Sequence, residues 1–372
     1  YKEKPDVGTF MREWLSLYDS KSGERGIYNG MSAKKTVEQL NERYKDGDGK
    51  FITRRATRED FGTNPCSEII LRSREFCNLS ECVVRREDTR ESLKEKVRTA
   101  AILGTFQSTL TEFKYLSREW KKNCDEERLL GVSLTGIMDN PLTNGSKKGL
   151  DTLLEELRDI AYETNKEWSD KLGIPVSAAI TCVKPSGTVS QLVDSASGIH
   201  ARHNPHYIRT VRADNKDPLC KLMQDMGFPN EVDVTKPEHT TVFSFPMKTP
   251  KGAVCRMDMT ALEQLELWKV YAESWCEHKP SVTISVKEDE WVEVAAWVYE
   301  HFDSISGISF LPFSEHVYRQ APYQDCTEEE YKEALKTMPK NVDWAELSKY
   351  ESQDYTIASQ ELACTAGGCE II

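Results

Sequence analysis

The sequence of 372 residues predicts an α/β fold, in which a mostly parallel sheet or barrel is covered by helices. Between residues 128 and 312, strand-like and helix-like segments alternate, and the strand-like ones are continuous apolar runs, as in strands buried on both faces. The hydrophobic fraction of 38% is enough for a core, and the charged fraction of 30%, with aromatic residues throughout, argues against disorder. The length suits two domains or one large α/β unit.

The individual elements follow from local patterns. Two polar helices are expected at 8–20 and 33–46, the second with Ser32 as its N-cap and the glycines of 47–49 at its end. A strand is expected at 76–84, and apolar residues at helical spacing predict helix from 89 to 122. Further strands are expected at 128–138, 177–183, 240–246, 281–287 and 307–312, and helices at 149–173, 261–278 and 288–302.

Charge and cysteine usage restrict the function classes. A net charge of −12 disfavours a general polyanion binder, so a phosphorylated substrate would need a local site of backbone amides and a few basic side chains. The eleven cysteines are odd in number and lack a repeating spacing, which indicates a reducing compartment, the cytoplasm, rather than a disulfide framework. No signal peptide and no apolar run of ~20 residues is found. The chain begins with Tyr1 rather than Met, and we expect it to be part of something longer.

The segment NPCSEI at 64–69 is the first candidate site. A turn stiffened by proline would present Cys66 at a loop tip, with Glu68 pointing the same way if the loop is extended and Asn64 able to bind hydroxyl groups. Cys77 follows Cys66 by eleven positions, on the next strand. A reacting thiol, a carboxylate base and a second thiol as reductant suit chemistry that ends in an oxidised dithiol. A surface turn with two buried cysteines is the alternative.

The segment KPSGTVSQL at 184–192 is the second candidate. A strand ends at Lys184, and a turn opens a short helix whose free N–H groups would face an anion. Candidate phosphate ligands are Ser186, Gly187, Thr188, Val189 and Ser190. An ordinary helix cap rich in Ser and Thr is the alternative, although a place at the carboxyl end of a strand favours binding.

Two further patterns lie toward the end of the chain. Cys364 and Cys369 in CTAGGC flank a flexible Gly pair near the C-terminus, which indicates a mobile dithiol that exchanges disulfides. His200, His203 and His206 in HARHNPH lack the fixed geometry of a metal site, because Pro205 interrupts a helix, and a polar loop is expected instead.

Together these motifs strongly resemble a ribonucleotide reductase catalytic chain. The motifs that carry the resemblance are NPCSEI, the second cysteine eleven positions on, KPSGTVSQLVDSASGIH and CTAGGC, with SGERGIYN, YIRTVRAD, HKPSVTISVKEDEW and GISFLPFSEHVYRQAPY as further stretches. Within the family the chain is most similar to class II, the adenosylcobalamin-dependent enzymes, and to their monomeric ribonucleoside-triphosphate reductases. The resemblance covers nearly the whole chain but only the C-terminal half of the reductase.

The resemblance implies a fold, a cofactor and partners. Residues 1–324 would be a catalytic half of the family's ten-stranded α/β barrel, with a finger loop at about 61–77, and residues 325–372 a C-terminal extension with a flexible tail. Adenosylcobalamin would start the reaction, which reduces ribonucleoside triphosphates to 2′-deoxyribonucleotides. A thioredoxin-like protein would restore the terminal dithiol. No nucleic acid, membrane or metal ligand is expected.

The resemblance also assigns roles to residues. Cys66 would carry the thiyl radical, Glu68 would take the 3′-hydroxyl proton, and Asn64 would hold the ribose hydroxyls. Cys77 would belong to the reducing thiol pair, and the 186–190 turn would bind the substrate phosphates. Cys364 and Cys369 would re-reduce the active-site disulfide.

One departure from the family pattern matters, because the family's partner of Cys77 lies in the N-terminal half and no cysteine precedes Cys66 here. We therefore expect one part of a split reductase, or a truncated chain, that needs a separate N-terminal half. A class I large subunit is the nearest alternative, but it relays its radical through paired tyrosines and no Tyr-Tyr dipeptide occurs. A class III glycyl-radical enzyme fits less well. A non-catalytic redox-sensing binding module is the alternative from another class.

Overall fold

The computed structural model describes residues 3–23, 26–42, 54–56, 60–313 and 319–351. These residues form two units, one from Tyr1–Ala201, Gly252–Val254 and Asp258–Phe313, the other from Arg202–Lys251, Cys255–Met257 and Ser314–Ile372. Residues 202–251 belong to the second unit. None of the described helices has the length and apolar character needed to cross a membrane.

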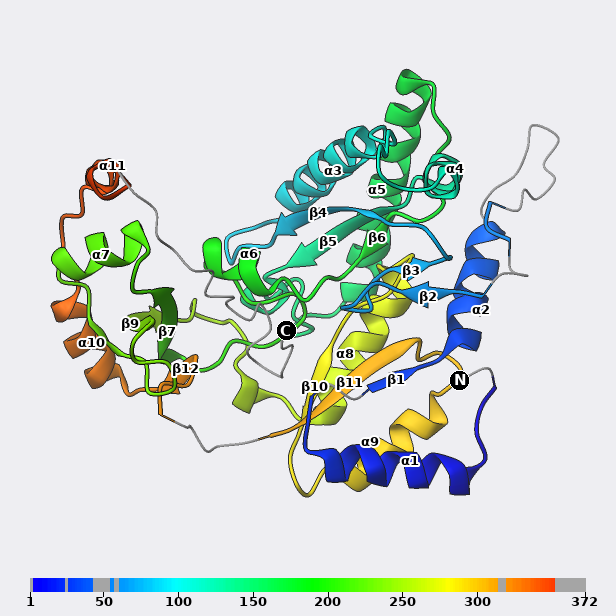
Figure 1. The fold of residues 1–372 in the computed structure, drawn as a ribbon. Coiled ribbons are helices and arrows are strands. Elements are labelled where there is room, and N and C mark those ends of the chain that lie inside the picture. Colours follow the sequence, from blue (N-terminus) through cyan, green and yellow to red (C-terminus); the bar gives the residue numbers. More distant parts are fainter. Residues whose placement is uncertain (1–2, 24–25, 43–53, 57–59, 314–318, 352–372) are drawn as a thin grey trace. The chain divides into compact units, whose positions relative to one another are not determined.

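The first unit is a mixed α/β structure, as the sequence predicts (Figure 1). Its helices are α1 (Val7–Ser20), α2 (Gly30–Asn41), α3 (Arg90–Gln107), α4 (Arg118–Glu127), α5 (Leu150–Leu172), α6 (Gly187–Leu192), α8 (Ala261–Ser274) and α9 (Trp291–Glu300). Its strands are β1 (Gly26–Tyr28), β2 (Gly62–Thr63), β3 (Ile70–Leu71), β4 (Asn78–Val83), β5 (Leu130–Thr135), β6 (Thr181–Cys182), β10 (Thr283–Val286) and β11 (Gly307–Pro312). A short 3-10 helix spans Ile137–Asp139 in this unit; Trp344–Glu346 in the second unit is another, and a third, Arg256–Asp258, spans the division between the units.

Strands β4, β5 and β6 form a parallel sheet whose two faces differ in character. One face packs on the helices: the Ser80 hydroxyl donates to the carbonyl of Ala100 on α3, and α3 and α5 cover this side in Figure 1. Because side chains alternate along a strand, Leu79, Glu81 and their neighbours in register point to the opposite face. We call this opposite face, which carries Leu79, Glu81, Gly131, Ser133 and Cys182, the inner face.

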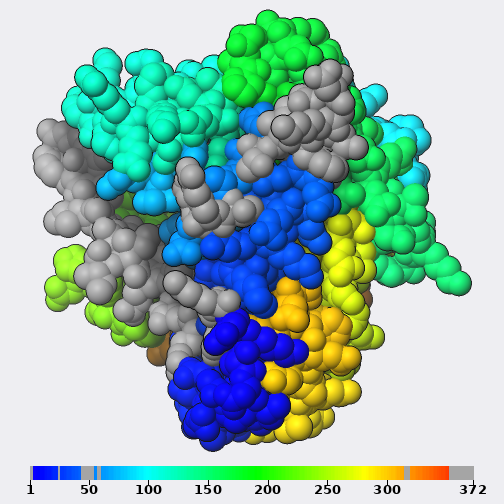
Figure 2. Space-filling view, turned by 90° about the vertical axis from the view of Figure 1, so that its right-hand side faces the viewer, coloured from blue at the N-terminus to red at the C-terminus, as the bar shows by residue number. Residues whose placement is uncertain are grey.

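The second sheet of this unit has the order β1-β11-β10, with β10 and β11 parallel and β1 antiparallel. An isolated parallel bridge between Val183 and Pro280 joins the residue after β6 to the segment that precedes β10. In the part of the chain that the structure describes, the strands form open sheets and no closed barrel. Helix α1 packs beside α9 and covers this region, as Figure 2 shows in blue and yellow-orange. The rings of Trp14 and Phe310 meet edge to face, with their centroids 4.9 Å apart.

The second unit has an antiparallel sheet, which the predicted strand–helix alternation did not indicate. Its strands β7 (His206–Asp214), β8 (Asn230–Val232), β9 (Thr240–Lys248) and β12 (Tyr323–Asp325) have the order β12-β7-β9-β8, accompanied by α7 (Pro218–Asp225), α10 (Glu328–Thr337) and α11 (Leu347–Tyr350). The expected strand at 240–246 exists, but its main partner is β7, which runs antiparallel to it over its whole length. The prediction of a mostly parallel sheet is therefore wrong for this unit.

Several predicted boundaries are corrected by side-chain capping. Asn29, rather than Ser32, caps α2, since its Oδ1 accepts from the backbone N–H groups of Met31 and Ser32. The expected end of that helix at 47–49 lies outside the described residues. The helix expected over 89–122 is two helices, because Ser108 and Thr109 turn their hydroxyls back onto the carbonyls of α3 and end it.

Candidate active site

The loop between β2 and β3 holds Cys66 in a tight turn. The amide of Ser67 donates to the carbonyl of Asn64 at 2.9 Å, which closes the turn around Pro65 and Cys66. The Asn64 side chain tightens the same loop, because its Oδ1 accepts from the amide of Ile69 at 3.0 Å. Ser67 has a φ of 68°, a left-handed conformation that is unfavourable for a residue other than glycine. Something outside the turn must therefore stabilise it.

That support comes from residues 278–281, which leave α8 and run beside β6. His278 Nδ1 accepts from the amide of Ile70 at 3.3 Å, and the amide of Lys279 donates to the carbonyl of Glu68 at 3.2 Å. The Ser281 hydroxyl donates to the carbonyl of Cys66 at 2.6 Å. The loop is thus held at three alternate residues, Cys66, Glu68 and Ile70, from its tip onward.

The loop tip borders a hollow of about 210 Å³, which we call the Cys66 hollow. Its lining consists of Gly26, Ile27, Tyr28, Cys66, Ser67, Ser281, Val282, Gly307, Ile308 and Ser309. Cys66 is partly exposed, so its thiol can meet a molecule that enters from this side. Most of the lining residues are small, which leaves room beside the thiol.

Glu68 lies close to the end of the parallel sheet, beside the Lys184 that follows β6. Its side chain is fully buried, and Lys184 Nζ lies 3.6 Å from its Oε1. Among the residues described, no group donates a hydrogen bond to either of its carboxylate oxygens. A buried carboxylate with free acceptor positions is costly, because it has lost its hydration without replacement. It is therefore available to a hydroxyl group that enters the site.

Cys77 lies at the inner face of the sheet. A Cβ placed on Gly131 would come within 3.2 Å of Cys77 Sγ and 3.1 Å of Ile69 Cδ1, so the loop, the thiol and β5 meet at this glycine. Burial, followed by the negative charge of Glu68, raises the pKa of the Cys77 thiol well above its ordinary value. The thiol is therefore protonated at neutral pH, as a hydrogen donor must be.

The inner face brings two further groups to the same place. Glu81 and Cys182 align with Ser133 across the three strands, so all three share this face. Burial raises the pKa of Glu81, while the nearby Ser186 hydroxyl and the charge of Lys184 lower it. Burial and the neighbouring Cys77 raise the pKa of Cys182.

The phosphate turn expected at 184–192 opens α6, as predicted, directly after β6. Ser186 has a φ of 54° and its hydroxyl lies beside Glu81 rather than capping the helix. The expectation that the amides of 186–190 are all free is wrong for Ser190, whose N–H donates to the carbonyl of Ser186 at 3.2 Å. Ser190 is also buried, whereas Gly187, Thr188 and Val189 are exposed.

Five further residues were singled out from the sequence: two terminal cysteines and three histidines. Cys364 and Cys369 are outside the described residues. His200 belongs to the first unit and His203 to the second, where its Nε2 is 2.6 Å from Asp325 Oδ1. Within the described ranges, no group of three or more His, Cys, Asp and Glu side chains is arranged to hold a metal ion.

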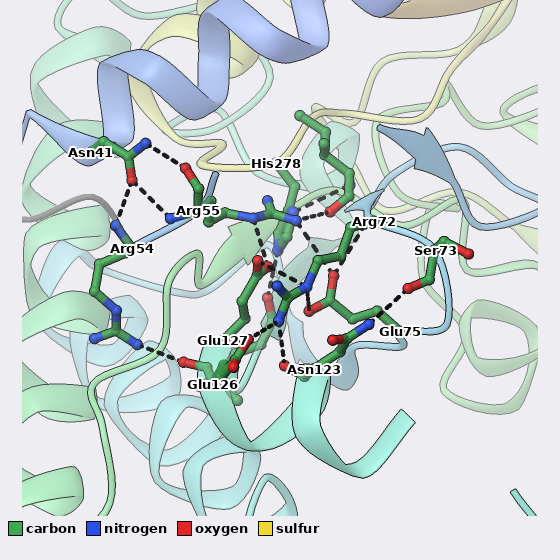
Figure 3. Close-up of polar contacts among 12 residues, drawn as sticks. Asn41, Arg54, Arg55, Arg72, Ser73, Glu75, Asn123, Glu126, Glu127 and His278 are labelled. Carbon is green, nitrogen blue, oxygen red and sulfur yellow. Dashed lines mark hydrogen bonds and ion pairs between the residues drawn. The ribbon is translucent and has the colours of Figure 1, made fainter. Parts of the chain in front are cut away.

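A buried cluster of ion pairs lies behind the loop (Figure 3). Arg55 Nε is 2.7 Å from Glu127 Oε2, and Arg55 Nη2 is 3.6 Å from Glu75 Oε2 and donates to the Ile70 carbonyl at 2.9 Å. Arg72 Nε completes the cluster, 3.5 Å from Glu75 and 3.2 Å from Glu127. The cluster connects the loop to α4 and to the segment before Cys77.

The cluster predicts a pH dependence of stability. Burial and the neighbouring Glu127 raise the pKa of Glu75 from 4.5 to about 8, so the folded chain keeps a proton that the unfolded chain releases. Between these values the free energy of unfolding falls as pH rises. We expect Glu75→Gln to reduce the loss of melting temperature between about pH 5 and about pH 8. Glu119→Gln on α4, whose carboxylate is half-exposed, is the control, and equal pH profiles for Glu75→Gln and wild type would contradict the assignment.

Sequence reasoning did not identify Glu81, His278, Lys279 or Ser281 as site residues, and it placed Lys184 in the phosphate turn without predicting its contact with Glu68. Strand alternation from Cys77 through Leu79 would have placed Glu81 on the same face. The 278–281 segment was part of a stretch typical of the family, but no local pattern showed that it contacts a loop more than 200 positions earlier.

Comparison with known proteins relates the chain to one enzyme class. It is 30% identical over 283 residues to the adenosylcobalamin-dependent ribonucleoside-triphosphate reductase of Euglena gracilis, covering 76% of this chain and 38% of that protein. It is 26% identical to the enzyme of the same name from Lactobacillus gasseri, covering 94% of this chain and 49% of that protein. The chain thus spans about half, or less, of these curated relatives. No family model matches it.

Solved structures agree on the fold. A B12-dependent, class II ribonucleotide reductase matches with a TM-score of 0.75 at 23% identity, covering 92% of this chain and 50% of that one. The class Id α subunit from Actinobacillus ureae matches with a TM-score of 0.55 at 13% identity, covering 83% and 62%. Of these two, the class II structure has the higher TM-score.

Proposed function

Because its curated relatives are adenosylcobalamin-dependent ribonucleoside-triphosphate reductases, we propose that this chain is the C-terminal part of such a reductase and reduces ribonucleoside triphosphates. The observation that carries the proposal is the loop at 64–70. It presents a partly exposed thiol on a supported turn and, two residues later, a buried carboxylate with unfilled acceptor positions. An enzyme that handles a sugar radical needs both groups fixed and shielded from water.

The residues divide the reaction between them. Cys66, as a thiyl radical, takes the 3′ hydrogen atom of the ribose and later returns it. Glu68 accepts the proton of the 3′-hydroxyl, and Asn64 contacts the ribose hydroxyls. The 2′-hydroxyl leaves as water when Cys77 and a second thiol supply two electrons and two protons and become a disulfide.

The Cys66 hollow suits the approach of a cofactor to the thiol. Radical initiation is the chemistry that adenosylcobalamin supplies when bound. The hollow is small, so the residues lining it would meet only the reacting end of so large a molecule. Ile27, Val282 and Ile308 are among its lining residues and would provide an apolar part of the wall near Cys66.

Substrate phosphates would bind where α6 begins. Gly187 and Thr188 are exposed residues that follow the carboxyl end of β6, so their amides and the Thr188 hydroxyl would be available to an anion. Lys184 would add a positive charge beside them. Val189 and Ser186 complete the turn, whereas buried Ser190 would act by shaping it.

Two partners complete the proposal. The second thiol of the Cys77 pair would come from a separate N-terminal part, since the chain spans only half of its relatives. Cys364 and Cys369 would reduce the active-site disulfide by exchange, and a thioredoxin-like protein would restore them. This dithiol chemistry fits the cytoplasm.

Complementation tests the proposal. The 372-residue chain alone should form no deoxynucleotide from a ribonucleoside triphosphate, adenosylcobalamin and a dithiol. Addition of the matching N-terminal part should give turnover, measured by chromatography of the nucleotides, that requires the cofactor. Turnover by the chain alone would contradict the requirement for a second part, and its absence from the mixture would contradict the reductase assignment.

A further inference from the structure

Lys279 is buried to 1% exposure, yet it carries an ionisable group directly behind the reactive loop. Its Nζ donates to the Ser67 hydroxyl at 2.8 Å and lies 5.4 Å from the centre of the Tyr28 ring. Its backbone amide holds Glu68, as described above. One residue thus contacts the loop through both side chain and backbone, on either side of the bond between Ser67 and Glu68.

Gly307 makes room for this contact. A Cβ at Gly307 would lie 2.2 Å from Lys279 Nζ and 2.9 Å from Ser67 Oγ. No side chain other than hydrogen therefore fits at this position of β11 while the two groups remain together. Both displaced atoms are at the ends of side chains, so an added methyl group would separate them without breaking the strand.

The contact falls on the unfavourable residue of the turn. Ser67 is the left-handed residue that directly follows Cys66, and such a conformation persists only where surrounding groups hold it. Burial lowers the pKa of Lys279 to about 7, although the carboxylate of Glu68 raises it. Keeping an ammonium group here opposes folding at and below neutral pH, which indicates a role other than stability.

We propose that Lys279 is a positioning residue for Cys66: packed against Gly307, it holds Ser67 and thereby fixes the turn that presents the thiol to the Cys66 hollow. The inference rests on the proposed function for its catalytic consequence, but the geometry concerns this chain alone. The 278–281 segment is then a functional part of the site rather than a connection between α8 and β10.

The first test measures the position of the thiol without catalysis. In the full chain, the rate at which iodoacetamide alkylates Cys66 is followed by peptide mass spectrometry for wild type, Lys279→Met and Gly307→Ala. Both variants should expose Cys66 and raise this rate severalfold, while the rate at Cys326, in the other unit, stays constant as an internal control. Lys171→Met, on the surface of α5, should behave as wild type.

The second test separates positioning from stability. Lys279→Met should melt at the wild-type temperature or above, since it removes a buried charge, whereas its turnover in the reconstituted enzyme should fall about 100-fold with little change in KM. The double variant Ser67→Ala with Lys279→Met should lose little more turnover than Lys279→Met alone, because both substitutions remove the same hydrogen bond. A wild-type alkylation rate with wild-type turnover, or a lowered melting temperature with faster alkylation of all thiols, would overturn the proposal. Absence of turnover in wild type would refute only the reductase function.

Discussion

Cys66→Ser is expected to abolish nucleotide reduction in the reconstituted enzyme while leaving the chain folded. An S–H bond is weak enough to give up its hydrogen atom to a carbon radical and to regain it, whereas the O–H bond of serine is too strong. Turnover should therefore fall about a thousandfold or more, equivalent to about 4 kcal/mol on the barrier. The measurement is deoxynucleotide formation with all other components present.

The fold should tolerate this change because the turn is held through backbone groups. Ser281 contacts the carbonyl of Cys66, and the closing hydrogen bond joins Ser67 to Asn64. Neither involves the sulfur atom. Cys326→Ser, at a partly exposed thiol of the second unit, is the matched control and should retain wild-type turnover. Substantial turnover by Cys66→Ser would show that another residue carries the radical.

The local parts of the fold followed from the sequence, but its pairings did not. The helical pattern at 149–173 became α5 with small changes at its ends, and the apolar run at 128–138 contains β5 at Leu130–Thr135, although Ile137 and Met138 lie in a 3-10 helix instead. The strand at 240–246 was also predicted, but its antiparallel direction relative to its partner was not predicted. Whether a strand pairs parallel or antiparallel depends on which distant segment lies alongside it. The partner here is β7, and because its buried residues do not alternate regularly, the sequence pattern did not predict that strand.

The candidate site divides in the same way. A turn at Pro65 and a short helix after Lys184 were readable from short motifs. The contribution of Lys279 was not, because a lysine is normally exposed and nothing near it in the sequence predicts burial. Its contact with Ser67 depends on the absence of a side chain at Gly307, on a third segment. Sites assembled from several loops contain such residues, which only coordinates reveal.

The buried ion cluster allows the largest expected effect on stability. Arg55 is 1% exposed and contacts both Glu75 and Glu127. Its removal leaves the buried Glu127 carboxylate with Arg72 as its remaining cation in the described cluster, while Glu75 is protonated below about pH 8. Breaking a buried pair in this way costs about 3–5 kcal/mol, because the uncompensated charge cannot regain its hydration. Arg55→Met should lower the free energy of unfolding, measured by urea denaturation, by about this amount.

A matched pair of variants distinguishes the charge imbalance from a simple loss of packing. Arg54→Met removes the neighbouring arginine, which is less buried and donates to a backbone carbonyl of α4, and should cost much less. Arg55→Met combined with Glu127→Met removes one charge of each sign, leaves Glu75 beside Arg72, and should recover part of the lost stability. If the double variant is as unstable as the sum of its parts, packing rather than charge accounts for the effect of Arg55. Recovery would mean that the cluster stabilises the loop by balancing charges behind Cys77, whose pKa both Glu75 and Arg55 affect.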